Sequence, residues 1–315
     1  MAPKVGIIGA GGIARHLKKR LTKKGWIVAW IGGRSLGDLR LLEKVDLVFN
    51  AISTLDNGEA ARDNILFFVK RGIPVVTCEK GALAYHAKVL RRYMRLIGYQ
   101  AACGGGSELL RYLLRLGVAD RRGTHFWTVL NASLNMLFSE IGKGTKPGVA
   151  HRLAQKRRFL EPGKGSLFFA VSGELQDVLR KACVLFNTVL AKKEYLTPDM
   201  LTSWSLSQKE LRFLCRHAKD YRYVVAFMNY KSGFGRQRHH GGFEAKVGEW
   251  SIKAGFRLIP PASRWIPDGP TNAVGIAGVD KNKRPFKVFS GKGAGHRPTT
   301  TAMITDAERL LGLRR

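Results

Sequence analysis

The sequence predicts an α/β protein with a doubly wound parallel sheet in the first half of the chain and an α+β region with an antiparallel sheet after it. Three observations indicate this. Short apolar runs alternate with runs of helical period between residues 4 and 130. A glycine-rich turn follows the first apolar run. After residue 131, helical patterns come first and strand-like runs follow as a group. Alternation is typical of parallel sheets, whereas segregation is typical of α+β folds.

The first half contains short apolar runs separated by helical patterns. We expect strands at residues 4–9, 26–31, 45–52, 73–77, 99–103 and 125–130. The helical patterns run up to residue 24 and then occupy residues 60–71, 87–96 and 108–116. Because a helix between two parallel strands must cross one face of the sheet, this order predicts helices on the sheet faces.

The second half has a different rhythm. Helical patterns are expected at residues 150–159, 173–192 and 208–217, and strands at 221–229, 243–247, 250–258, 272–279 and 285–289. A last helix, at residues 299–313, has an apolar face that is expected to pack back on the first domain. We therefore expect a first domain at residues 1–135, completed by the C-terminal helix at 296–315, and a catalytic and dimerisation region at 136–295.

The charge of the chain is strongly positive, with 54 basic and 23 acidic residues and a formal net charge of +31. The basic residues are dispersed on helical patterns, without a basic tail or interleaved aromatic residues. This arrangement predicts non-specific contact with polyanions and no dedicated nucleic-acid site.

Other global features indicate a cytoplasmic protein. No apolar run reaches the roughly 18 residues of a membrane span. The N-terminus has one lysine and a short apolar segment, which is a poor secretory signal. The four cysteines lie far apart without a C-x-x-C pair, so we expect free thiols and no metal site.

A dinucleotide-binding turn is predicted at the end of the first strand. Gly9, Gly11 and Ala14 fit G-x-G-x-x-A, and Gly12 and Ile13 open the following helix. In this motif the first glycine makes the turn, the second admits a pyrophosphate, and the small third residue lets helix and strand pack closely. The motif predicts a Rossmann domain that binds its cofactor through these five residues.

The end of the second strand favours NADP over NAD as that cofactor. NAD sites usually carry an acid there, whereas this chain has Arg34 and Ser35, which suit a 2′-phosphate. NAD is the alternative. Ser53 and Thr54, which follow the third strand, are also assigned to the cofactor site.

Lys80 is the first catalytic candidate. It follows the strand at 73–77, and Cys103 begins a glycine-rich stretch after the strand at 99–103. Because ligands bind at the carboxyl ends of parallel strands, both stretches are expected to open on one crevice. Lys80 would place an ammonium group beside the cofactor and the substrate.

Several segments resemble homoserine dehydrogenases. Residues 75–84 read V-V-T-C-E-K-G-A-L-A, similar to V-V-T-A-N-K-x-x-[LI]-A of that family. The sugar-oxidoreductase family is less similar, because Gly81 stands where it has proline. Further matches in family order lie at residues 99–106, 130–137, 154–162, 177–182, 271–274 and 291–299.

The resemblance implies reversible NAD(P)-dependent conversion of L-aspartate 4-semialdehyde to L-homoserine, a step of threonine and methionine biosynthesis, by a homodimer. Lys80 and Lys181 match the two active-site lysines of the family, Asp177 a substrate-site carboxylate, and Glu161 a glutamate that contacts substrate. Hydride transfer builds negative charge on the aldehyde oxygen, and the lysines would stabilise that charge and supply a proton.

The chain also departs from the family pattern. Ser172 occupies the position of a second family aspartate, and Glu174 is near it but not aligned. Gln100 replaces a glutamate that helps to bind a monovalent cation in relatives. Two alternatives therefore stay open: an NADP-dependent reductase of another small amino or hydroxy aldehyde, and a nucleotide-binding pseudoenzyme or polyanion-binding protein.

Overall fold

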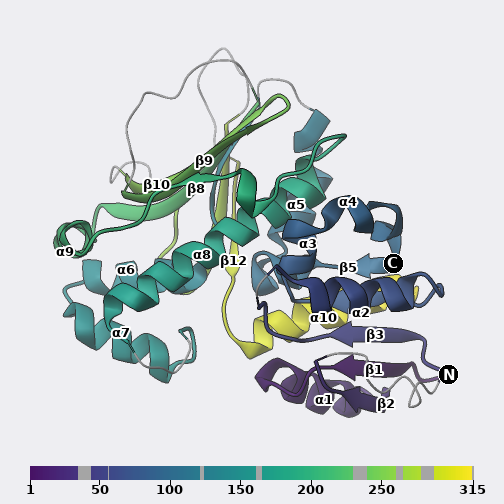
Figure 1. Cartoon of the computed structure of the whole chain (residues 1–315). Coiled ribbons are helices and arrows are strands. Elements are labelled where there is room, and N and C mark those ends of the chain that lie inside the picture. The colour runs from purple at the N-terminus through teal and green to yellow at the C-terminus, as the bar shows by residue number, and fades with distance from the viewer. Residues whose placement is uncertain are drawn as a thin grey trace.

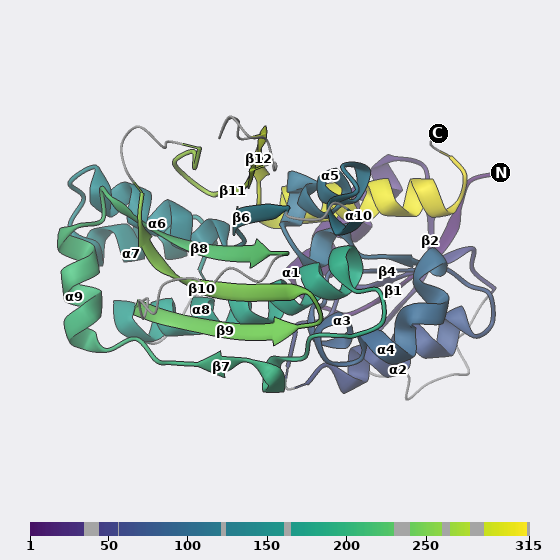
Figure 2. The same ribbon diagram turned by 90° about the horizontal axis from the view of Figure 1, so that it is seen from above.

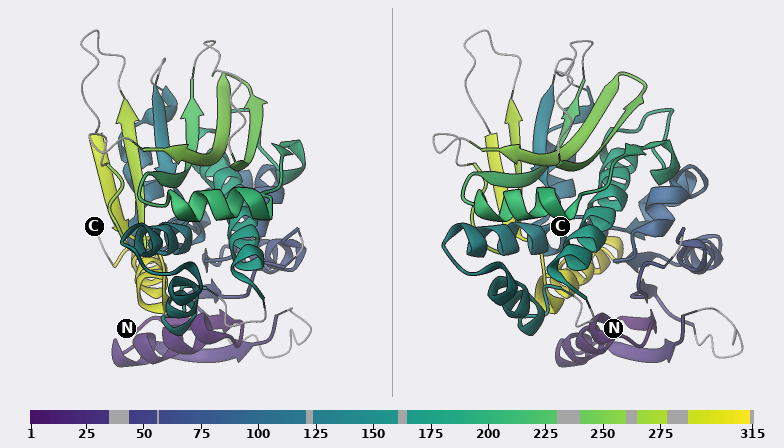
Figure 3. Two further views of the ribbon diagram at one scale, coloured as in Figure 1. Left: turned by 90° about the vertical axis from the view of Figure 1, so that its left-hand side faces the viewer. Right: turned by 60° about the vertical axis from the view of Figure 1, so that its left-hand side comes forward.

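The computed structural model describes residues 1–34, 44–55, 57–120, 124–160, 165–229, 240–259, 265–277 and 287–313. It contains two sheets, which lie at opposite ends of the molecule with helices between them (Figures 1 and 3). One sheet is parallel and the other antiparallel, as the sequence predicts.

The parallel sheet has the strand order β2-β1-β3-β4-β5. Its strands are β1 (Lys4–Ile8), β2 (Ile27–Gly32), β3 (Leu47–Asn50), β4 (Val75–Thr77) and β5 (Ile97–Gly98). The strand expected at 99–103 is wrong, because β5 ends at Gly98 and a 3-10 turn follows at Gln100–Ala102.

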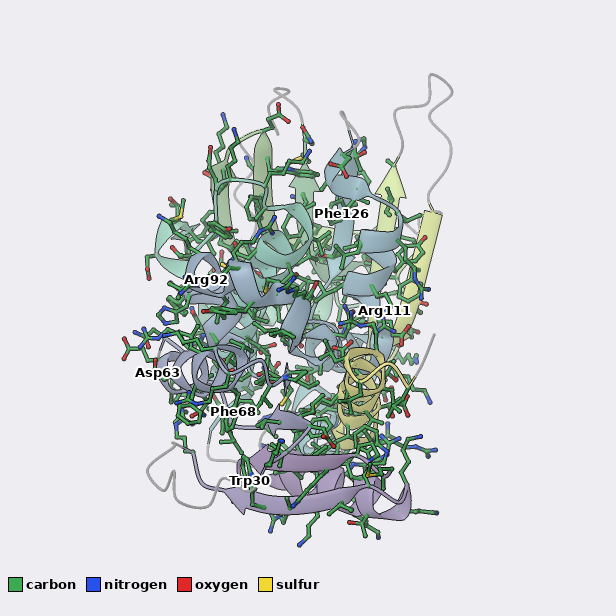
Figure 4. The ribbon with its side chains drawn as sticks, turned by 90° about the vertical axis from the view of Figure 1, so that its right-hand side faces the viewer. Trp30, Asp63, Phe68, Arg92, Arg111 and Phe126 are labelled. Atoms are coloured by element: carbon green, nitrogen blue, oxygen red, sulfur yellow. The ribbon has the colours of Figure 1, made fainter. Side chains whose placement is uncertain are left out.

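Helices cover both faces of this sheet, so its strands are apolar on both sides. Val5 and Ile7 of β1 pack in one core with α1 and α10, whereas Ile8 packs in a second core with α2. On that second face, the Phe68 ring of α2 stacks on Trp30 of β2 (Figure 4). The helices that pack on this sheet are α1 (Gly12–Lys23), α2 (Glu59–Val69) and α10 (His296–Leu310). The short helices α3 (Gly81–Tyr85) and α4 (Ala87–Leu90) follow β4, and α5 (Leu109–Arg115) packs on the second sheet.

The last helix, α10, packs on the parallel sheet beside α1, as predicted. The buried Asp306 carboxylate on α10 pairs with Arg111 of α5 at 2.9 Å and accepts a hydrogen bond from the backbone amide of Gln100. Arg111 lies close to α10 in Figure 4. The end of the chain is thus tied to the first hundred or so residues (Figure 1).

Within the described ranges, the antiparallel sheet has seven strands in the order β12-β11-β6-β8-β10-β9-β7. Neighbouring strands of this sheet lie side by side in the view from above (Figure 2). The strands of this sheet are β6 (His125–Val129), β7 (Thr202–Ser203), β8 (Tyr221–Met228), β9 (His240–Val247), β10 (Trp250–Leu258), β11 (Thr271–Ala277) and β12 (Lys287–Lys292). The expectation that residues 125–130 extend the parallel sheet is wrong, because β6 pairs with β8 and β11.

Helices α6 and α8 pack on this sheet, α7 packs on both of them, and α9 packs on α6. They are α6 (Ala132–Gly142), α7 (Pro147–Lys156), α8 (Leu167–Leu185) and α9 (Gln208–Arg216). The sequence patterns missed α6, and they placed the start of α8 six residues too late. Helix α8 crosses the middle of the molecule between the two sheets (Figure 1). None of the helices in the described ranges is both long enough and apolar enough to cross a membrane.

Candidate active site

A cavity of about 740 Å³ lies where the carboxyl ends of the parallel strands face α7 and α8. Its walls come from the glycine-rich turn after β1, the segments after β3 and β4, the start of α10, and one face of α8. Residues far apart in the sequence therefore meet here, at the edge of the sheet where ligands of such folds bind.

The glycine-rich turn has the local geometry that the motif requires. Gly9 has φ +117°, and a Cβ there would lie 2.6 Å from the Ala51 carbonyl oxygen, so only glycine fits. Within the described part of the chain, a Cβ on Gly11 would meet nothing within 4 Å. Gly11, Gly12 and Ile13 line the cavity, while Ala14 is buried against the sheet.

Arg34, one of the two predicted 2′-phosphate residues, lies against the segment that follows β3. Arg34 donates a hydrogen bond from its guanidinium to the Ser53 carbonyl oxygen at 3.1 Å. Ser53 and Thr54 line the cavity. The structure thus brings three of the predicted cofactor residues together, whereas Ser35 lies outside the described residues.

Lys80 is held at the cavity wall by two hydrogen-bonding features. Its backbone amide donates to the Thr54 hydroxyl at 3.2 Å. The preceding residue, Glu79, is buried, and its carboxylate accepts from the backbone amides of Gly81 and Ala82 at the start of α3. Glu79 therefore caps this short helix, which gives a structural reason for an acid where the family has asparagine.

Helix α8 presents one continuous face to the cavity. The residues on this face recur at intervals of three and four, which is the spacing of one side of a helix. They are Ser166, Phe169, Ala170, Gly173, Glu174, Asp177, Arg180 and Lys181. Ser172, the position that matches the second family aspartate, is not among the cavity-lining residues described by the structure.

Asp177 binds both predicted lysines. The Lys80 ammonium lies 3.2 Å from Oδ1 and the Lys181 ammonium lies 2.6 Å from Oδ2. The three side chains are 14–25% exposed, so the group is only partly open to solvent. The structure therefore brings Lys80, Asp177 and Lys181 together from separate halves of the chain.

The charges in this cluster are strongly coupled. Burial opposes ionisation of Asp177, but the Lys181 and Lys80 ammonium groups outweigh it and hold the pKa of Asp177 well below its ordinary value. In turn, the Asp177 carboxylate raises the pKa of Lys80 despite its burial. Asp177 and Lys80 are therefore both charged at neutral pH. Negative charge that develops on a ligand oxygen beside the ammonium groups would be stabilised here.

Asn131 and Glu174 are site residues that sequence reasoning did not assign. The Asn131 amide donates to Glu174 Oε2 and to Asp177 Oδ2, and its oxygen caps α6 through the Leu134 amide. Burial, followed by the nearby Asp177 carboxylate, raises the pKa of Glu174 to about 7. The i,i+3 spacing of Glu174 and Asp177 was a visible signal that the two acids share a helix face.

The two cysteines near the site are poor nucleophiles. Cys78 lines the cavity, but Cys103 is fully buried, and its thiol donates to the Lys181 carbonyl. Burial raises the pKa of the Cys78 thiol to about 11 and that of Cys103 to about 12. Both thiols are therefore protonated at neutral pH.

Two further predictions concern the rest of the site. Glu161 lies outside the described residues. No group of three or more His, Cys, Asp or Glu side chains in the described ranges is arranged to hold a metal ion.

Comparisons with known proteins agree with this architecture. No protein-family model and no curated protein matches the sequence. Among solved structures, a homoserine dehydrogenase from Thiobacillus denitrificans is similar with a TM-score of 0.68 and 18% identity, over 99% of this chain and 74% of that chain. One from Thermoplasma acidophilum has a TM-score of 0.69 and 14% identity, over 98% of this chain and 99% of that chain.

A third similar structure is a hyperthermophilic archaeal homoserine dehydrogenase in complex with NADPH. Its TM-score is 0.65 at 17% identity, and the match covers 100% of this chain and 99% of that chain. At these identities the likeness establishes the fold alone. The chain has the fold of these homoserine dehydrogenases, with a parallel sheet joined to an antiparallel sheet.

Proposed function

We propose that this chain is a homoserine dehydrogenase-like oxidoreductase that uses NADPH to reduce L-aspartate 4-semialdehyde to L-homoserine. One observation carries the proposal: the Lys80 and Lys181 ammonium groups converge on Asp177 at the wall of the cavity that also contains the glycine-rich turn. The fold neighbours support it, since they are homoserine dehydrogenases and one is in complex with NADPH.

The residues present fit a nicotinamide dinucleotide. The open space above Gly11 and the amides at the start of α1 suit a pyrophosphate. Arg34, Ser53 and Thr54 would hold the adenosine end, and the arginine supplies a bidentate donor for a 2′-phosphate. The proposal also includes Ser35 as a cofactor-binding residue and Glu161 as a substrate-binding residue.

The side chains of the cluster have distinct roles in this reaction. When bound, NADPH supplies the hydride that reduces the aldehyde carbon. Lys80 and Lys181 stabilise the negative charge that develops on the oxygen, and one of the two donates the proton that completes the alcohol. Asp177 holds both ammonium groups in place until substrate arrives. The lysine regains its proton from solvent.

A titration and a substrate panel test this function. We expect the intrinsic fluorescence to report NADPH binding about tenfold tighter than NADH binding, with the preference lost in R34A. NADPH should then be oxidised on addition of L-aspartate 4-semialdehyde. If NADPH is oxidised only with other small aldehydes, one of those aldehydes is the substrate instead. If the protein binds neither NADPH nor NADH, the proposal is overturned.

Assembly is a separate part of the proposal. The resemblance implies a homodimer formed through the region at residues 136–295, and sedimentation velocity would distinguish a dimer from a monomer.

A further inference from the structure

The cavity has two acids among its described lining residues, and they are in different situations. Asp177 has both oxygens engaged, Oδ1 by Lys80 and Oδ2 by Lys181 and the Asn131 amide. Its charge is therefore already compensated by two ammonium groups from the protein. An ammonium group on a ligand would compete poorly for this carboxylate.

Glu174 is the acid that remains available. Its Oε2 accepts from the neutral Asn131 amide, while Oε1 has no hydrogen bond or ion pair to any residue that the structure describes. Neither lysine forms an ion pair with it within those residues. Glu174 precedes Asp177 by three positions on α8, about 5 Å along the helix axis, so it faces the same cavity next to the lysine cluster.

We propose that Glu174 binds the ammonium group of the α-amino aldehyde substrate and makes this site select amino-bearing over amino-lacking substrates. The inference rests on the function proposed above and names the residue that sets its substrate class. Lys80 and Lys181 would meet the reacting oxygen, and Glu174 would meet the amine one helical turn away. The chain thus places its second acid at position 174, whereas the family alignment points to Ser172.

The electrostatics of the cavity support this role. The charged and titratable groups that face Glu174 are Asp177 and Lys181 on its own helix and Lys80 across the cavity, while Arg180 and His151 of α7 also line the cavity. Because the pKa of Glu174 is about 7, the free site holds this carboxyl partly protonated at neutral pH. A ligand ammonium would favour the ionised form, so binding and deprotonation of Glu174 are linked.

Calorimetric titration with L-homoserine and with 4-hydroxybutanoate, which lacks the amino group, tests the assignment in the presence of NADPH, the reduced cofactor, which cannot oxidise either alcohol. The wild type should bind L-homoserine about 10- to 100-fold tighter than 4-hydroxybutanoate. E174Q should lose this preference while binding 4-hydroxybutanoate as the wild type does. E140Q, the same substitution on α6 outside the cavity lining, should keep the preference.

A second readout is pH. L-Homoserine affinity of the wild type should rise about tenfold between about pH 6 and about pH 8, and that of E174Q should stay flat. E174D keeps the carboxylate and should retain part of the preference for L-homoserine. This variant would show that the loss in E174Q comes from the missing charge and not from misfolding.

The outcomes separate this assignment from the proposed reaction. Equal affinity of the wild type for the two ligands overturns the role of Glu174, as does retained discrimination in E174Q with loss in E161Q. A third outcome is that E174Q loses the discrimination while the wild type fails to oxidise NADPH with the semialdehyde. This result would remove the proposed reaction and leave the role of Glu174 supported.

Discussion

At the scale of single residues, the two glycines of the turn after β1 have different roles. Gly9 is required by the backbone, because its φ of +117° and the adjacent Ala51 carbonyl leave no room for a side chain. Gly11 is different, since its φ of −74° suits any residue and the described structure leaves space above it. The two glycines of one motif therefore serve the fold and the ligand respectively.

Substitution of these two glycines separates the roles. G9A should lower the free energy of unfolding by about 1–3 kcal/mol, because it forces strain and a clash. G11A should change stability by less than about 0.5 kcal/mol but weaken NADPH binding at least about tenfold, because the new methyl occupies the pyrophosphate space. Urea unfolding and fluorescence titration measure both, and a G11A protein with unchanged NADPH affinity would place the cofactor elsewhere.

The raised pKa of Glu174 predicts a pH dependence of stability. The folded protein keeps a proton on this carboxyl that the unfolded chain releases near pH 4.5, so the contribution of Glu174 to stability falls as pH rises from about 4.5 to about 7. Relative to E174Q, the wild type should therefore become less stable over this window. Urea unfolding at about pH 5 and about pH 8 measures the difference between the two proteins. A constant difference contradicts the raised pKa.

At the scale of elements, the short helix α3 fixes the position of Lys80. Its first amides are buried, and the Glu79 carboxylate is their acceptor. Asn187, in a turn of π-helix after α8, donates to the Leu83 and Ala84 carbonyl oxygens of α3. These contacts connect the element that positions Lys80 to the helix that carries Lys181.

Removal of the α3 cap should therefore affect both stability and turnover. E79A leaves two buried amides without an acceptor and should cost about 1–3 kcal/mol. It should also lower kcat, because the backbone that holds Lys80 is released. E59A is the matched control, since Glu59 is exposed in the first turn of α2 and should cost less than about 0.5 kcal/mol. Equal effects of the two substitutions would refute the capping role.

The sequence patterns predicted most elements but failed where periodicity does not carry the information. Helix α6 was missed because it is buried on nearly all sides and so has no polar face to mark its period. Residues 99–103 resemble a strand in sequence because they are mostly apolar, although glycines with positive φ at 104 and 105 turn the chain there. The pattern of β6 is that of a strand, but sequence order does not reveal which sheet a strand joins.

The site was predictable to a similar extent. The spacing of Asp177 and Lys181 placed both on one helix face, and the glycine motif located the turn. The contact of Lys80 with Asp177 joins segments about a hundred residues apart, so only the resemblance pointed to it. Alignment with the family does not identify Glu174 as a site residue, because Ser172 occupies the family position. The face of α8 on which Glu174 lies, which the alignment does not show, places it in the cavity wall.

At the scale of the whole molecule, the C-terminal helix α10 packs back on the N-terminal part of the chain. Asp306 is 1% exposed and pairs with Arg111, and Lys24 of the segment after α1 pairs with Glu308. The start of the same helix contributes Thr299 to the cavity wall. Closure of the chain and completion of the site are thus properties of one helix.

Loss of the buried pair tests this closure. D306A leaves the Arg111 guanidinium and the Gln100 amide without their carboxylate and should lower the free energy of unfolding by about 3–5 kcal/mol. D63A, which removes the exposed partner of Arg62, should cost less than about 1 kcal/mol. Urea unfolding compares the two, and a D306A protein as stable as D63A would show that α10 is held by its apolar face alone.

The most direct measurement of the central claim is the rate of NADPH oxidation by L-aspartate 4-semialdehyde in the wild type and in K181A. If the two ammonium groups on Asp177 stabilise the developing oxyanion, K181A lowers kcat by about 10²- to 10⁴-fold and leaves NADPH affinity unchanged. K192A, at an exposed lysine beyond the cavity lining, should match the wild type. A K181A protein with wild-type kcat would contradict the mechanism.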